Sequence, residues 1–156
     1  SAIRRIGHIS DPSIDIPAAI EEFELPHEFT LEAVQEAKQY GKRIGTKEIK
    51  QRKDFTSWEI VTIDPDTARD FDDAISLTTD AKGHFHLGVH IADVAHYVKP
   101  GMQLDEEAFT RCNSTYFPGK CVPMLPEELS NELCSLKPNV ARLTQSVLAE
   151  FDKVGK

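Results

Sequence analysis

The sequence predicts an α/β (α+β) fold, with a mixed, mostly antiparallel sheet and a few helices. Two observations support this prediction. Short segments rich in β-branched residues and bounded by turn residues predict four strands, near residues 59–63, 73–79, 84–92 and 146–152. One segment, near residues 31–41, has the apolar spacing of a helix.

Local signals support these elements in turn. Thr30 is a suitable N-cap for the helix, and Gly41 or Gly45 would end it. Gly83 supplies the turn that joins the second and third strands. One more short helix is expected between residues 99 and 117.

Composition narrows the class of protein. The chain has 156 residues, 40% of them apolar, which suits one domain with a real core. No apolar run approaches the roughly 20 residues of a membrane span, so no membrane association is expected. The three cysteines are an odd number without C-x-x-C spacing, which disfavours a zinc site or disulfide framework and fits a cytoplasmic protein. The net charge of −8 opposes nucleic-acid binding unless a longer protein carries the basic surface elsewhere.

The stretch "TIDPDTARDFDDAIS", residues 62–76, gathers carboxylates between apolar segments. Two carboxylates roughly 4 Å apart repel by about 4 kcal/mol at an effective dielectric near 20. Alternation along the strands places Asp64 at a strand end and turns Asp73 toward a packed face, where an unpaired charge is costly. The candidate site residues are Asp64, Asp70, Asp72 and Asp73.

The repulsion between these carboxylates can be reduced by raised pKa values, by cationic side chains or by a bound metal ion. A metal ion explains the cluster best. Arg69 is the only basic residue inside the cluster and cannot neutralise four acids. All-oxygen ligands favour Mg²⁺, Mn²⁺ or Ca²⁺ over Zn²⁺ or Cu²⁺. An acidic, solvated hairpin loop remains an alternative. An EF-hand is disfavoured, because Arg69 stands where that loop needs its sixth-position glycine.

Three long stretches carry a resemblance to a known family: "TIDPDTARDFDDAIS", "HLGVHIADVAHYVKPG" and "STYFPGKCVPMLPEELSNELCSLKP". In this order and at these intervals, they resemble the start of the catalytic (RNB) domain of the ribonuclease II / ribonuclease R family of 3′ to 5′ exoribonucleases. The resemblance covers residues 59–151 most strongly and is closer to the ribonuclease R branch. It implies processive, metal-assisted hydrolysis of single-stranded RNA to nucleoside 5′-monophosphates.

The resemblance also implies domain limits. Residues 1–10 are expected to end an upstream cold-shock (OB-fold) domain, and residues 11–57 to form a linker with one helix. Residues 58–156 are expected to be the truncated N-terminal portion of the RNB catalytic domain. The family's downstream arginine and glutamate, and its RNA-binding cold-shock and S1 domains, fall outside such a fragment. We therefore expect the fragment alone to be inactive.

In the family, the aspartates that match the four candidates form a magnesium site at the bottom of a channel for a single RNA strand. The resemblance thus implies Mg²⁺ as cofactor, with Mn²⁺ as a possible substitute, and catalysis that depends on Asp72. Tyr116 matches an aromatic residue that stacks on a base near the 3′ end. Single-stranded RNA is the expected partner of the full-length protein, while the oligomeric state is not predicted.

Structural interpretations compete with functional ones at several positions. Tyr116 is compatible with a core tyrosine. His90 and Asp93, three residues apart on a strand, point to opposite faces and are expected to have structural roles. Arg111 and Arg142 are expected to be solvated at the surface. Two other functions stay open: a pseudo-nuclease that binds RNA without cutting it, and a calcium-stabilised structural domain.

Overall fold

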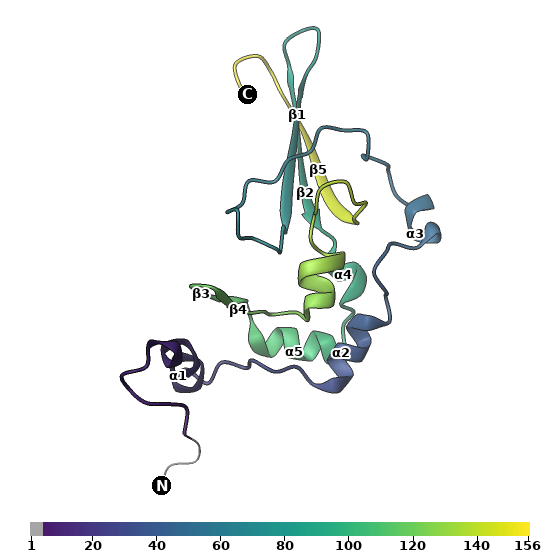
Figure 1. Ribbon diagram of the computed structural model, residues 1–156. Helices are drawn as coiled ribbons and strands as arrows, with labels where there is room; N and C mark the ends of the chain where they lie inside the picture. The colour runs from purple at the N-terminus through teal and green to yellow at the C-terminus, as the bar shows by residue number, and fades with distance from the viewer. Residues whose placement is uncertain (1–4) are drawn as a thin grey trace.

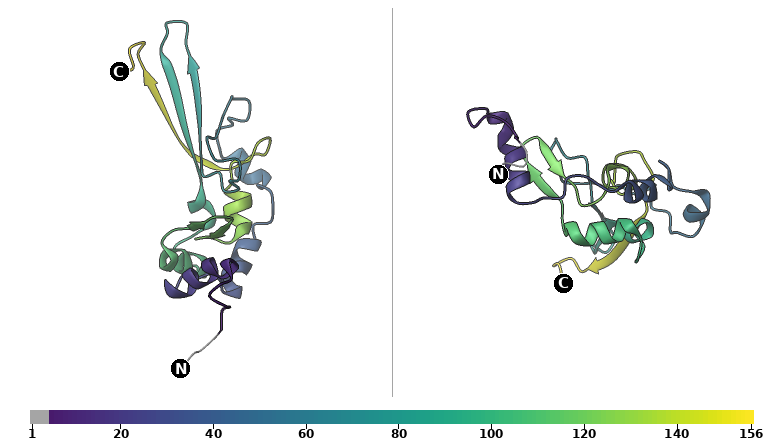
Figure 2. Two further views of the ribbon diagram at one scale, coloured as in Figure 1. Left: turned by 60° about the vertical axis from the view of Figure 1, so that its left-hand side comes forward. Right: turned by 90° about the horizontal axis from the view of Figure 1, so that it is seen from below.

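The computed structural model describes residues 5–156. Helices lie at one end of the molecule and a three-stranded sheet projects from them (Figure 1). The β1–β2 turn and the C-terminus lie at the far end of the sheet, away from the N-terminus (Figure 2). Helices and antiparallel strands together agree with the predicted fold class.

The N-terminal third contains more helix than the sequence predicted. Residues 1–4 of the segment expected to end an upstream domain lie outside the described residues, and residues 5–10 form coil and a turn. The expectation of one helix within residues 11–57 is wrong. The helices are η1 (Pro12–Ile14), α1 (Asp15–Glu22), α2 (Leu31–Lys38) and α3 (Thr46–Lys50). Pro12 and Pro17 lie in the first turns of η1 and α1, where a proline is tolerated.

Helix α2 confirms the helix expected near residues 31–41. It begins after Thr30, whose Oγ1 accepts a hydrogen bond from the backbone N–H of Ala33 at 3.2 Å. Ala33 and Ala37 are fully buried, and α2 packs against α5. The helix ends at Lys38, shortly before Gly41, which has a φ of +70° that favours glycine.

The sheet has the order β1-β2-β5, with both pairs antiparallel. Its strands are β1 (Asp73–Thr79), β2 (Phe85–Ala92) and β5 (Thr144–Phe151), which confirms three of the four predicted strands. Gly83, with a φ of +82°, donates its backbone N–H to the Asp80 carbonyl at 3.0 Å in the β1–β2 turn.

The strand predicted near residues 59–63 is wrong. Only one bridge forms there, through two backbone hydrogen bonds of 2.9 Å between Val61 and Ile75. Val61 and Ile63 are exposed, so this segment has no buried face to hold it along the edge of β1. Asp64 therefore lies in a loop and not at a strand end.

The remaining elements form the helical end of the molecule. They are α4 (Val94–Tyr97), α5 (Gln103–Arg111), the hairpin of β3 (Thr115–Phe117) and β4 (Lys120–Val122), and the π-helix η2 (Leu129–Leu133). Helix α5 confirms the short helix expected between residues 99 and 117. Leu104, Leu129 and Leu133 are buried in the core that these elements share with α2.

The face of β1 that is buried is not the one that the sequence predicts. Ala74 and Ser76 are buried, while Asp73 and Leu77 are exposed. The expectation that Asp73 faces a packed side is therefore wrong. The covered face is the opposite one, where the ring of Phe55 lies against that of His90 with centroids 5.5 Å apart.

Candidate metal centre

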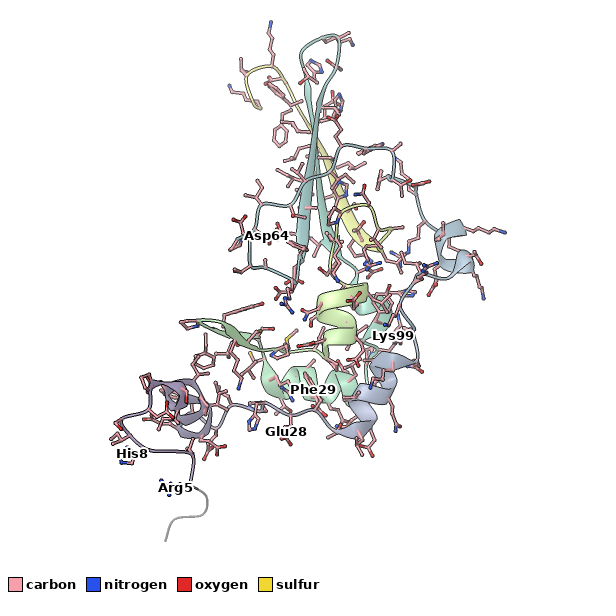
Figure 3. The ribbon with its side chains drawn as sticks, in the orientation of Figure 1. Arg5, His8, Glu28, Phe29, Asp64 and Lys99 are labelled. Atoms are coloured by element: carbon pink, nitrogen blue, oxygen red, sulfur yellow. The ribbon has the colours of Figure 1, made fainter. Side chains whose placement is uncertain are left out.

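The loop between the Val61 bridge and β1 carries the candidate aspartates. Figure 3 shows Asp64 on this loop, beside the sheet. A turn follows it, in which the backbone N–H of Ala68 donates to the Pro65 carbonyl at 2.9 Å. Near its end, the Asp72 carbonyl accepts a hydrogen bond of 2.9 Å from the N–H of Ala92 in β2. The loop is thus attached to the sheet where Asp72 and Asp73 enter β1.

The charges of three of the candidate aspartates act on the fourth, Asp72. Desolvation by surrounding protein raises the pKa of Asp72, although the residue as a whole keeps exposed surface. The negative charges of Asp70, Asp73 and Asp64 raise that pKa further. No ion pair within residues 5–156 involves any of these four residues. Cationic side chains of the described region therefore do not neutralise the cluster.

Tyr116 reaches the cluster from strand β3. Its hydroxyl donates a hydrogen bond to the carboxylate of Asp70. This bond is the largest cause that raises the pKa of Tyr116, to about 12, so the phenol stays protonated at neutral pH. The residue is 62% exposed, which contradicts the alternative of a core tyrosine.

Cys134 is close enough to Asp72 for the charge of Asp72 to act on its thiol. It is buried, and desolvation, followed by the charge of Asp72, raises its pKa to about 12. The thiol is therefore neutral at physiological pH and is a poor nucleophile. Cys134 is therefore not a candidate nucleophile of this site.

The donor set fits a hard divalent cation, since it consists of carboxylate oxygens. Within the described residues, no three His, Cys, Asp or Glu side chains converge closely enough to hold a metal ion. Mg²⁺, however, is usually bound through one or two carboxylates together with waters and substrate phosphates. Its binding therefore does not require three protein ligands that already converge.

Two other candidates have structural contacts. His90 is buried in the sheet between the hydroxyls of Ser76 and Ser146, at 3.0 and 2.9 Å. Asp93 is 2% exposed and pairs with Arg52 at 2.6 Å. These contacts agree with structural roles for both residues, but Asp93 follows β2 at the start of α4, so the expectation that the two lie on one strand is wrong.

The surface role predicted for Arg111 is wrong. Its guanidinium is buried, donates to the carbonyls of Pro26, Glu28 and Pro123, and lies 3.6 Å from the ring centroid of Phe29. Figure 3 shows Glu28 and Phe29 beside α5, on the segment that leads to α2. Arg111 therefore attaches this segment to α5, because the guanidinium can donate to several carbonyls at once.

A family model described as RNB domain matches residues 52–156. The match covers more than half of the chain, so the chain belongs to the RNB domain family. Among curated proteins, Ribonuclease R of Chlamydia pneumoniae is 53% identical over 150 residues, which are 96% of this chain and 22% of that protein. The predicted family is thereby confirmed.

Solved structures give the same result. Mycoplasma genitalium RNase R, in complex with double-stranded RNA or with ribose methylated single-stranded RNA, matches with a TM-score of 0.85 and 40% identity. Each match covers 95% of this chain and 26% or 23% of the other chain. Yeast Ssd1, a pseudonuclease, matches with a TM-score of 0.75 and 24% identity over 97% of this chain and 19% of its own, which shows the fold alone.

The chain thus spans about a fifth of the length of the Chlamydia pneumoniae Ribonuclease R. In the part of the chain that the structure describes, no helix is long and apolar enough to cross a membrane.

Proposed function

We propose that this chain forms the N-terminal part of the catalytic domain of a metal-dependent 3′ to 5′ exoribonuclease. The substrate is single-stranded RNA, which is hydrolysed processively to nucleoside 5′-monophosphates in the cytoplasm. One observation carries the proposal: the charges of Asp64, Asp70 and Asp73 all act on Asp72. Membership of the RNB domain family supports it.

Each candidate residue has a role in this proposal. The ligands of Mg²⁺, or of Mn²⁺ in its place, are Asp64, Asp70, Asp72 and Asp73. The bound ion would activate water and stabilise the leaving oxygen. Desolvation and the charges of its acidic neighbours raise the pKa of Asp72, so a bound cation would stabilise its charged form. Tyr116 offers an exposed ring for a base, and base stacking contributes about 1–3 kcal/mol.

RNA as the partner is supported by the RNA present in the two M. genitalium RNase R complexes. The net charge of −8 opposes binding of a phosphate backbone by this chain alone. Most of the affinity for RNA should therefore come from other parts of the full-length protein.

A second candidate is an RNA-binding relative without nuclease activity. The yeast pseudonuclease shares the fold, but at 24% identity this similarity does not bear on activity. The two candidates differ in whether bound RNA is degraded, and the four clustered aspartates, as possible metal ligands, favour degradation.

The test uses a full-length ribonuclease that contains this chain, with uniformly labelled single-stranded RNA and Mg²⁺. Asp72→Asn should lower the single-turnover rate by about 10²–10³ or more, while RNA affinity in filter binding stays nearly unchanged. Asp66→Asn is the matched control, because Asp66 lies in the same loop beside Pro65 and is not one of the four proposed ligands.

Equal losses of rate and affinity in Asp72→Asn would contradict the proposed role of this residue. An Asp66→Asn variant as slow as Asp72→Asn would do the same. A wild-type protein that binds RNA without releasing mononucleotides would support the pseudonuclease instead.

A further inference from the structure

Ser135 holds the backbone of the aspartate loop from a position far away in the sequence. Its side chain is fully buried. The hydroxyl donates to the carbonyl of Arg69 at 2.7 Å and accepts from the N–H of Phe71 at 3.1 Å. Both partners lie more than sixty residues earlier in the chain, and they flank Asp70.

The same loop is held at two further atoms. The Phe71 carbonyl accepts a hydrogen bond of 2.8 Å from the N–H of Leu136, and the Asp72 carbonyl accepts one from Ala92. The peptide groups on either side of Asp70 and Asp72 are thus bound to the body of the protein. Because backbone position sets where a side chain begins, these bonds fix the starting points of both carboxylates.

Ser135 is itself held rigidly. It follows the π-helix η2, in which the N–H of Cys134 donates to the carbonyl of Leu129 at 2.8 Å. Leu129 and Leu133 are buried in the core, and Arg142 donates to the Ser135 carbonyl at 3.0 Å. Short π-helical turns of this kind are often found at functional sites. The position of the hydroxyl therefore follows from the packing of the core.

The two bonds of Ser135 require a group that donates and accepts at once. A hydroxyl does both. Alanine does neither, and a thiol is only a weak donor and a weak acceptor. Loss of the hydroxyl would leave the Arg69 carbonyl and the Phe71 N–H without this partner, and the loop would loosen around Asp70.

We propose that Ser135 is a positioning residue for the metal centre, which sets the spacing of Asp70 and Asp72 without touching metal or RNA. This inference rests on the proposed function, because it assigns to Ser135 the support of proposed metal ligands. Residues that support metal ligands typically change metal affinity by roughly 10–100-fold when they are mutated.

The experiment compares the wild-type 156-residue chain with Ser135→Ala, Ser135→Cys and Ser76→Ala. Mn²⁺ affinity is measured by electron paramagnetic resonance, and amide hydrogen exchange is measured at Phe71. Ser76 is the matched control: it is also a buried serine, but its hydroxyl hydrogen-bonds to His90 of β2 at 3.0 Å and not to the aspartate loop. Ser135→Cys has the shape of serine with a slightly larger side chain, so it leaves no cavity and serves as a second variant in case Ser135→Ala does not fold.

Ser135→Ala should weaken Mn²⁺ binding by roughly 10–100-fold and speed exchange at Phe71 by about tenfold or more. Ser135→Cys should show smaller changes in the same directions. Ser76→Ala should lower thermal stability but leave both quantities within about twofold of wild type.

The inference would be overturned if both Ser135 variants bound Mn²⁺ as tightly as the wild type. It would also be overturned if the amide of Phe71 exchanged at the wild-type rate in both variants. Equal effects of Ser76→Ala would also overturn it, because they would show a general loss of stability. If the wild-type chain binds no Mn²⁺ but Ser135→Ala still accelerates exchange at Phe71, the metal centre of the proposed function fails while the support of the loop by Ser135 stands.

Discussion

The hydroxyl of Tyr116 donates a hydrogen bond to the carboxylate of Asp70, which connects strand β3 to the aspartate loop. One residue thus presents an exposed ring beside the site and also contacts a proposed metal ligand. In the proposed function, the ring and the hydroxyl have separable tasks: the ring stacks on a base and the hydroxyl orients Asp70.

Substitutions of Tyr116 should separate these tasks in a full-length ribonuclease that contains this chain. Tyr116→Ala should change the length of the final RNA product, because the stacking of about 1–3 kcal/mol per base is lost. Tyr116→Phe keeps the ring and should leave the product length unchanged. The products are resolved on a denaturing gel, and an unchanged ladder for Tyr116→Ala would refute the stacking role.

Asp72→Asn should stabilise the metal-free chain at neutral pH. The folded protein raises the pKa of Asp72, so its contribution to stability is present at low pH and is lost as the pH rises through that raised pKa. Asparagine removes the charge that is disfavoured at pH 7. With a chelator present, the melting temperature should rise at pH 7 and change little at pH 3, where the carboxyl is protonated.

Asp66→Asn provides the comparison for this measurement, since Asp66 is not among the charges that raise the pKa of Asp72. A lower melting temperature for Asp72→Asn at pH 7 would show that the aspartates do not repel one another in the folded chain.

Arg52→Met should destabilise the chain by about 3 kcal/mol, because it leaves the buried carboxylate of Asp93 without its partner. This value is the lower end of the range for breaking a buried ion pair, since Arg52 itself is partly exposed. The control is Lys38→Met, which removes an exposed pair with Glu128 and should cost less than about 1 kcal/mol. Urea unfolding measures both changes. Similar midpoints for the two variants would contradict a structural role for the Arg52–Asp93 pair.

The 156-residue chain alone should not degrade RNA. It spans 22% of its Chlamydia relative, and its net charge of −8 repels phosphate. Losing even one group that stabilises developing charge typically costs about 10²–10³ in rate. The purified chain is incubated with end-labelled single-stranded RNA and Mg²⁺ or Mn²⁺. Processive release of mononucleotides that Asp72→Asn abolishes would contradict this prediction.

Much of the fold was predictable because its signals are local. The cap at Thr30 and the turn at Gly83 each depend on a few neighbouring residues, and both elements formed where expected. The prediction of a strand at residues 59–63 failed because β-branched residues form a strand only where a sheet edge and a buried face are both available. Local sequence does not specify which face of β1 is covered, so Asp73 was placed on the wrong side.

The composition of the proposed site was also predictable, since the aspartates are close in sequence and carboxylates favour hard cations. The residues that hold the aspartate loop in place were not predictable. Ser135 lies more than sixty residues from its partners in the loop, and a single buried serine carries no sequence signal of its role. The buried position of Arg111 is not predictable for the same reason, because its carbonyl partners come mostly from a distant segment.

The most direct test of the central claim is the anomalous diffraction of Mn²⁺ in crystals of this chain soaked at saturating concentration. The account predicts a peak at the aspartate loop, with oxygen ligands that include the carboxylates of Asp70 and Asp72 and with water in the remaining positions. The account would be contradicted if the crystal bound Mn²⁺ elsewhere but not at the loop, and all four aspartates were solvated.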